Sequence, residues 1–250
     1  VFLCQSLSSR LQVMAASGTR RIYVMRHGEK SPNVVSSENF SLELLPEGLE
    51  SLAELKAFLD AFGVRFGRVL CSPFFRAVQT AKALVECVEI ETGLCEVLAD
   101  ELGLRDGAGG ASLEVLREKI DEVVRASSSS SSQLVATSEL VRDEDADTCI
   151  QCQERALTLV RRLREEHFDK GPLLLVTHGG CVFGLITALC KDSAQPFDEK
   201  QLVEMGCMTA LDFDGQSWKV VGSVVPVRRE GGVECVWSRS SSFGADSTKL

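Results

Sequence analysis

The sequence has little histidine, no excess of positive charge and no long apolar run. The last two shortages bear on which partners the protein can bind. Its 250 residues carry a formal net charge of −9, whereas nucleic acids and anionic membranes favour basic surfaces. No apolar stretch approaches the roughly 20 residues that cross a bilayer. We therefore expect neither nucleic acid nor membrane as a partner, and a phosphate site would have to gather its own arginines.

The ten cysteines show no regular spacing. Several of them, such as Cys71 and Cys190, lie in apolar segments, as buried reduced thiols do. Because reduced thiols are typical of a reducing compartment, the composition predicts a cytoplasmic protein. Cys149 and Cys152 form a single C-x-x-C pair without a second pair or neighbouring histidines, so we predict neither a zinc site nor a redox site there.

The composition divides the chain into one folded domain, residues 20–226, and segments of low structure. Residues 1–19 contain several serines and no acidic residue. We interpret them as a disordered leader, with organellar targeting as the alternative. Six consecutive serines near residues 126–133 predict a flexible insertion within the domain. Residues 227–250 are rich in serine and glycine and are predicted to be a disordered tail, with a short edge strand at 233–237 as the alternative.

Short apolar runs alternate with helical patterns along the domain. Most of these runs lack polar alternation, which is typical of strands buried on both faces. The expected strands are residues 21–25, 68–71, 95–98, 173–177, 209–213 and 218–225, and the expected helices are 46–63, 72–89, 112–125, 145–168 and 179–190. This order predicts an α/β three-layer sandwich, with helices on both faces of a mainly parallel central sheet. Asp214-Gly215 predicts a hairpin turn between the last two strands.

Two of the three histidines stand in the same local context, just past the end of an apolar run. Arg26-His27-Gly28-Glu29 follows one such run, and His178-Gly179-Gly180 follows another. Ligands bind at the carboxyl ends of strands in open α/β sheets. The alternative is a pair of core histidines, but a core residue has no need to lie just past a strand end beside a glycine. We therefore predict that His27 and His178 share an anionic site.

A third strand end adds Arg76 to this set. Ser72-Pro73 predicts the start of a helix, with serine as the N-cap, and this places Arg76 in the first helical turn. Backbone N–H groups and the positive end of the helix dipole favour anions there. Gly179 would let backbone amides approach a ligand closely. Together with Arg26, these residues predict a site for a phosphoryl group.

These motifs resemble those of the histidine phosphatase superfamily, also called phosphoglycerate mutase-like. The likeness rests on segments 26–29, 44–48, 72–81 and 176–180, and it spans about residues 20–226 in the family's order. The resemblance implies a phosphoglycerate mutase-like fold and a nucleophilic His27 that carries a transient phosphohistidine. It also implies that Arg26, Arg76, His178 and Gly179 bind the phosphoryl group, and that neither a metal nor another cofactor is needed.

The leaving oxygen needs a proton donor, and two candidates stay open. Gly179 follows the second histidine, where the acid phosphatase and phytase branch has aspartate, so the resemblance places the donor in the loop after the third strand. Segment 101–106 is similar to the E-P-G-L-x-E segment of UBASH-type tyrosine phosphatases and ecdysteroid-phosphate phosphatases. Asp106 then takes the place of the family's glutamate. Glu101, with its longer side chain, is the rival.

The resemblance predicts a metal-independent phosphomonoester hydrolase that acts on a phosphorylated small molecule or a phosphoprotein. Its rivals are phosphoryl transfer of the phosphoglycerate mutase type, a weakly active module that binds phosphorylated ligands, and a metal hydrolase. Segment 100–142 is serine-rich and acidic, which favours hydrolysis because mutases carry longer insertions and additional basic residues. The presence of all four basic site residues speaks against the binding module. Neither the substrate nor the oligomeric state follows from the sequence.

Overall fold

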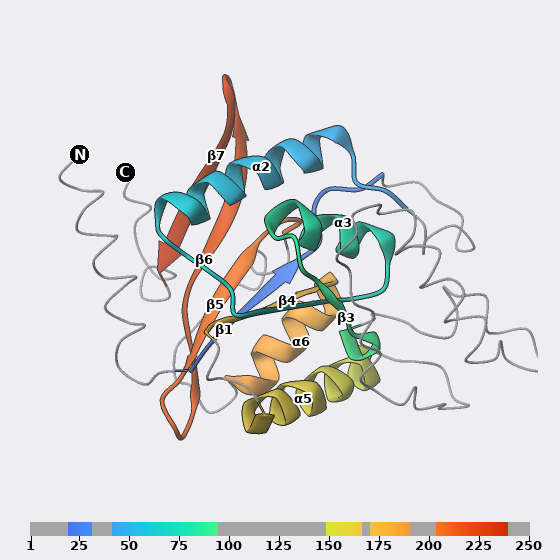
Figure 1. Ribbon diagram of the computed structural model, residues 1–250, viewed down its shortest axis with the longest axis vertical. Coiled ribbons are helices and arrows are strands. Elements are labelled where there is room, and N and C mark those ends of the chain that lie inside the picture. The colour runs from blue at the N-terminus through green and yellow to red at the C-terminus, as the bar shows by residue number, and fades with distance from the viewer. Residues whose placement is uncertain (1–19, 32–41, 95–148, 167–170, 191–203, 240–250) are drawn as a thin grey trace, which may run out of the picture.

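The computed structural model describes residues 20–31, 42–94, 149–166, 171–190 and 204–239. In these residues a seven-stranded sheet lies between two layers of helices (Figure 1). Helices α2 (Pro46–Ala61) and α3 (Phe75–Leu84) cover one face, and α5 (Cys149–Glu166) and α6 (Gly179–Leu189) cover the other. The predicted three-layer α/β sandwich is therefore confirmed. No helix in these parts of the chain combines the length and apolarity needed to cross a membrane.

The sheet has a parallel half and an antiparallel half, in the order β3-β2-β4-β1-β5-β6-β7. The parallel half consists of β3 (Glu89–Ile90), β2 (Arg68–Cys71), β4 (Leu173–Thr177) and β1 (Arg20–Arg26). The antiparallel half adds β5 (Met208–Phe213), β6 (Trp218–Arg229) and β7 (Gly232–Arg239). The predicted parallel pairing is thus found in the half of the sheet that carries the two histidine motifs.

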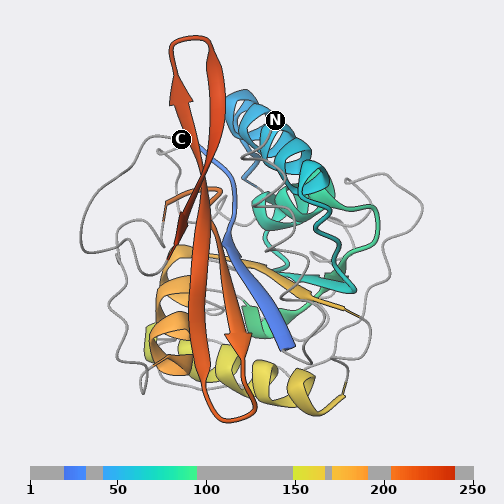
Figure 2. The same cartoon turned by 90° about the vertical axis from the view of Figure 1, so that its left-hand side faces the viewer.

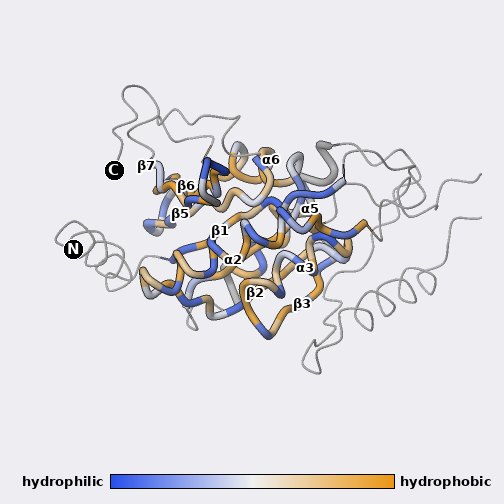
Figure 3. Tube along the Cα trace, turned by 90° about the horizontal axis from the view of Figure 1, so that it is seen from above, coloured by the Kyte–Doolittle hydropathy of each residue, from blue (hydrophilic) through white to orange (hydrophobic). Residues whose placement is uncertain are grey.

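The central strands are buried on both faces, which explains their unbroken apolar runs. On β1, Tyr23 and Met25 pack in the layer of α2 and α3, whereas Ile22 and Val24 pack in the layer of α5 and α6. Burial of one such aliphatic side chain contributes about 1.5–3 kcal/mol. Along α2, apolar and polar residues alternate, as expected of a helix with one face on the sheet (Figure 3).

The antiparallel half extends further than the sequence predicts. The hairpin turn at Asp214-Gly215 is confirmed, since Gly215 has a φ of +102° and the Asp214 carboxylate accepts two backbone N–H bonds. Beyond it, β6 and β7 form a long two-stranded ribbon beside α2 (Figure 2). The predicted disordered tail is therefore wrong over residues 227–239. The strands are held because Cys235 and Trp237 pack against the core that α2 covers.

Two predicted helix features are wrong at α3. The helix begins at Phe75, with Phe74 as its N-cap residue and no side-chain cap. Ser72 lies before it, and its hydroxyl contacts both the Phe74 N–H and His178. It ends at Leu84, since Val85 is extended and the chain turns back to form β3. The strand predicted at residues 95–98, the helix at 112–125, the leader and the serine insertion lie outside the described residues.

The start of α2 packs against the loop that follows His27. The backbone N–H of Leu45 donates to the carbonyl oxygen of Glu29 at 2.9 Å, and Pro46 stands in the first helical turn, where its missing N–H is not needed. A Cβ atom added at Gly48 would lie 2.6 Å from the same Glu29 oxygen. Gly48 therefore allows the helix to approach the loop backbone closely.

Substitution of Gly48 by alanine should destabilise the protein, because the new methyl group meets backbone that cannot move away at low cost. Overpacking of this kind costs about 1–3 kcal/mol. We expect that loss in the free energy of unfolding, measured with urea. Glu54→Ala, at an exposed position of the same helix, is the control and should stay within about 0.5 kcal/mol. Equal stabilities of the two variants would contradict the close contact.

Candidate active site

Three neighbouring strands, β2, β4 and β1, end side by side and bring the sequence motifs together. Arg26 on β1 lies opposite Thr177 on β4, and Cys71 on β2 lies opposite Val176 on the other side of β4. The residues that follow continue this pairing: His27 N–H donates to the Thr177 carbonyl, and Ser72 N–H donates to the Val176 carbonyl, each at 2.9 Å. The end of β4 therefore fixes the backbone of both neighbouring loops.

Four basic side chains meet at these strand ends. The His27 and His178 ring centroids lie 5.4 Å apart, and Arg76 Nη2 lies 3.3 Å from His178 Nδ1. A Cβ atom built on Gly179 would lie 3.4 Å from the Arg26 guanidinium carbon. His27, His178 and Arg76 are almost completely buried. The structure thus gathers Arg26, His27, Arg76 and His178 into one cluster.

His27 is held in the form that a nucleophile requires. Its Nδ1 lies 2.8 Å from the Gly28 carbonyl oxygen, which can only accept, so Nδ1 carries the proton and Nε2 keeps the lone pair. Burial, followed by the positive charge of Arg76, lowers the pKa of His27 from 6.5 to about 3, against the opposing effect of the Gly28 hydrogen bond. The imidazole is therefore neutral at physiological pH.

His178 is also neutral, but its protonated nitrogen is the other one. Since a guanidinium only donates, His178 Nδ1 accepts from Arg76, and Nε2–H donates to the Ser72 hydroxyl at 2.8 Å. Burial and the charge of Arg76 hold the pKa of His178 well below its usual value. The Phe74 ring contacts the imidazole edge-on, with centroids 4.8 Å apart. These contacts fix the orientation of the ring.

Thr80 connects α3 to the loop after His27, a contact that the sequence analysis did not identify. Its hydroxyl accepts from the Gly28 backbone N–H at 2.9 Å and donates to the Arg76 carbonyl at 2.7 Å. Thr80 lies four residues after Arg76, which places both on one face of the helix. That spacing is a signal from which the residue could have been found. α3 therefore positions both an arginine and the loop after His27.

Glu91 is a second residue that the sequence analysis missed. Its side chain, buried just past β3, accepts from the Gly93 backbone N–H and from Arg162 Nη2 on α5, each at 2.9 Å. The segment Glu91-Thr92-Gly93-Leu94-Cys95-Glu96 carries the pattern E-x-G-L-x-E and starts where β3 ends. That pattern could have been found in the sequence.

The candidate proton donors Asp106 and Glu101 lie outside the described residues, as does Glu96. Because β3 ends at Ile90, the loop after the strand that pairs with β2 begins at Glu91. The E-x-G-L-x-E segment is thus ten residues closer to the strand than segment 101–106. Glu96 stands at its last position.

Two buried cysteines of the described part of the chain are poor nucleophiles. Burial raises the pKa of Cys190 to about 11 and that of Cys207 to about 12, so both remain thiols. Cys181, in the first turn of α6, is disulfide-bonded, and its partner is not among the described side chains. The prediction of reduced thiols is therefore wrong at Cys181.

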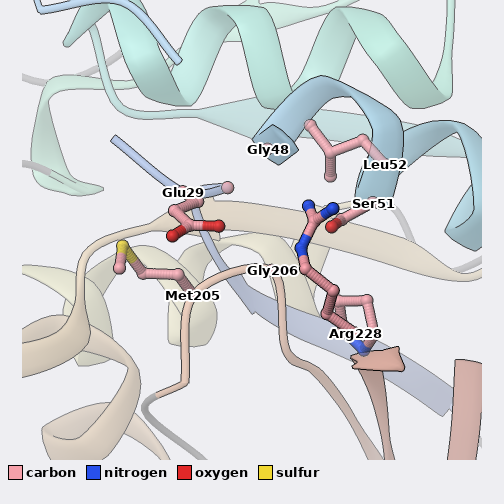
Figure 4. A pocket seen from close by; sticks show the side chains of 9 residues that line it. Glu29, Gly48, Ser51, Leu52, Met205, Gly206 and Arg228 are labelled. Carbon is pink, nitrogen blue, oxygen red and sulfur yellow. The ribbon is translucent and has the colours of Figure 1, made fainter. Parts of the chain in front are cut away.

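A depression lies on the α2 side of the loop after His27 (Figure 4). It is lined by Gly28, Glu29, Gly48, Ser51, Leu52, Met205, Gly206, Pro226 and Arg228. The Gly206 N–H donates to the His27 carbonyl at 3.0 Å, which joins the wall of the depression to His27. The Arg228 guanidinium is bound to Glu50 and to the Glu47 carbonyl. The depression is therefore a neighbour of the basic cluster and not part of it.

Comparison with solved structures finds proteins of similar fold. The ecdysone phosphate phosphatase of Bombyx mori, in complex with tungstate, is 16% identical with a TM-score of 0.58, over 85% of this chain and 96% of that one. A mycobacterial glucosyl-3-phosphoglycerate phosphatase with VO3 is 20% identical with a TM-score of 0.51, over 80% and 96%. A phosphoglycerate mutase from Bacillus anthracis is 20% identical with a TM-score of 0.51, over 83% and 93%. At these identities the likeness shows the fold alone.

The family assignment comes from the sequence as a whole. No curated protein matches the chain. The model of the histidine phosphatase superfamily (branch 1), however, matches residues 22–225, a span that holds all three strand ends and the four basic residues gathered there. The chain belongs to the histidine phosphatase superfamily, branch 1, and is a phosphatase of that family.

Proposed function

We propose that the protein hydrolyses phosphomonoesters through a phosphohistidine on His27, without a metal ion. The observation that carries the proposal is the neutral His27, whose Nε2 keeps its lone pair beside Arg76 and His178. Nε2 attacks phosphorus while the ester P–O bond breaks and its oxygen takes a proton. Water then attacks the phosphohistidine, the P–N bond breaks, and inorganic phosphate leaves.

The charges of the cluster suit a phosphate dianion. Both histidines are neutral, so Arg26 and Arg76 supply two positive charges to the non-bridging oxygens. The first turns of α3 and α6 add the positive ends of two helix dipoles. His178 contributes a hydrogen bond, and Gly179 leaves room for Arg26 at the start of α6. Fixed donors of this kind stabilise the charge that develops in the transition state without a metal.

Proton transfer to the leaving oxygen is assigned to a carboxyl group in the loop after β3. Asp106 and Glu101 are the two candidates from the resemblance. Glu96 is a third, because its segment has the complete E-x-G-L-x-E pattern and follows β3 directly. One of the three protonates the leaving group and later accepts a proton from the attacking water.

The substrate class we propose is a phosphorylated small molecule or a phosphoprotein in the cytoplasm. The net charge of −9 is unfavourable for nucleic acid and for anionic membrane surfaces. Phosphoryl transfer of the mutase type uses the same cluster and is the second candidate, favoured by the fold it shares with a phosphoglycerate mutase. The two differ in the acceptor, which is water in one case and a second hydroxyl group in the other.

Replacement of His27 by alanine should abolish the phosphatase activity. Loss of a nucleophile lowers kcat by at least about 10⁴-fold, measured with p-nitrophenyl phosphate. Wild-type protein, quenched during turnover with labelled substrate, should carry a label that is stable in base and lost in acid. His167→Ala, at the third histidine of the chain, is the control and should keep both activity and label.

Two results would contradict this mechanism. One is turnover by His27→Ala at a rate near that of wild type, and the other is loss of wild-type activity in EDTA. The mutase candidate is assayed directly with phosphoglycerate and a bisphosphate primer. If isomerisation is faster than phosphate release, the mutase reaction and not hydrolysis is the function of the protein.

The low pKa of His27 has a consequence for stability. The folded protein binds this proton only near pH 3, whereas the unfolded chain binds it near 6.5. The contribution of the neutral His27 imidazole to stability is therefore complete above pH 6.5 and is lost progressively as the pH falls below that value. In NMR titrations the His27 and His178 rings should show no midpoint between pH 8 and 5. A midpoint near 6.5 for either ring would contradict the buried, neutral pair.

The proton donor is found by comparing two substrates. An alkyl phosphate needs a protonated leaving group, whereas p-nitrophenolate leaves without one. Among Glu96→Gln, Glu101→Gln and Asp106→Asn, we expect one variant to lose about 10²–10⁴-fold in kcat on the alkyl phosphate, and far less on p-nitrophenyl phosphate. If all three variants keep full activity on the alkyl phosphate, the loop does not supply the acid.

A further inference from the structure

Glu91 lies just past the end of β3, near the basic cluster. It is fully buried, as few carboxylates are, and it follows β3 on the same edge of the sheet as His27 and His178. One carboxylate oxygen accepts from the Gly93 N–H and the other from Arg162 Nη2. Its own backbone N–H donates to the Cys71 carbonyl at 2.8 Å. Glu91 is therefore tied to α5, to β2 and to the turn that follows it.

That turn is the 3₁₀ helix η3 (Thr92–Leu94). Its last residue, Leu94, donates its N–H to the Glu91 carbonyl at 3.1 Å, and its side chain is buried in the core beneath α5 and α6. The Leu94 carbonyl accepts a hydrogen bond of 2.5 Å from the Thr177 hydroxyl. η3 therefore connects Glu91 to the last residue of β4 through hydrogen bonds.

Thr177 is linked directly to both His27 and His178. It precedes His178 in the chain, and its carbonyl accepts the His27 N–H at 2.9 Å. A shift of Thr177 would therefore displace the nucleophile and its partner together. The hydroxyl of Thr177 donates its hydrogen bond to the Leu94 carbonyl, so it is not a donor to the phosphoryl group.

We propose that Glu91 is a positioning residue for the phosphatase reaction. It holds η3 so that the Leu94 carbonyl anchors Thr177, and through Thr177 it sets the geometry of His27 and His178. The proposal rests on the proposed function for its effect on turnover, although the mechanical link is a property of the fold. The rival is a buried ion pair that adds stability without any effect on the site.

The test compares kcat and KM of Glu91→Ala, Thr177→Val and the double variant. Because misplacement by about 1 Å can cost 10²-fold, each single variant should lower kcat by roughly 10- to 100-fold, with KM changed by less than about threefold. Both substitutions break one chain of contacts, so the double variant should be no slower than the slower single variant.

Matched controls separate positioning from general loss of structure. Glu89→Ala removes a carboxylate from the same β3 strand, where it pairs with Arg68 at 2.6 Å, and should leave kcat within about twofold. Thr177→Ser keeps the hydroxyl and should restore the activity that valine loses. If Glu91→Ala does not fold, Glu91→Gln replaces it: glutamine retains an acceptor for Gly93 but not a charge for Arg162, and should give a smaller, equally non-additive loss.

Ring ¹⁵N NMR tests the link without turnover, and the chain has only three histidines to assign. Glu91→Ala should shift the His178 ring signals more than Glu89→Ala does, even if the wild type shows no phosphatase activity and the proposed function fails. An unchanged His178 signal, a kcat of Glu91→Ala within twofold of wild type, or multiplied losses in the double variant would each overturn the positioning role.

Discussion

The carboxyl end of β4 is the constraint on which the site depends. Its last two carbonyls, those of Val176 and Thr177, accept the backbone N–H groups of Ser72 and His27, and His178 follows in the same chain. Three segments far apart in the sequence are thereby held together at the end of β4. Strand pairing, stabilised by a core on both faces of the sheet, sets the positions of the basic cluster, so its geometry does not depend on loop conformation alone.

Burial of two neutral imidazoles beside two guanidiniums gives this acidic protein a local positive site. A protonated histidine would add charge that the surroundings disfavour, because desolvation and Arg76 both oppose it. The pair therefore provides one lone pair and one hydrogen-bond donor, while Arg26 and Arg76 carry the charge. Such a division suits an anion that must be attacked and held at once.

The sequence predicted the central fold well because the buried strands have unbroken apolar runs. β2 and β4 were predicted to the residue, and the convergence of His27, Arg76 and His178 followed from strand ends in a parallel sheet. Two predictions failed: α3 begins at Phe75 and not at Ser72, whose hydroxyl contacts His178, and packing against the core under α2 orders β7. β3 has two residues, too few for a pattern, so the sequence analysis did not identify this strand.

A crystal structure with vanadate tests the central claim most directly. Vanadate adopts the geometry of phosphorus during in-line attack, so the account predicts a bond from His27 Nε2 to vanadium. It also predicts contacts of the equatorial oxygens with Arg26, Arg76 and His178. Vanadate bound elsewhere, for example beside Arg228 in the neighbouring depression, with no bond to His27 Nε2, would contradict it.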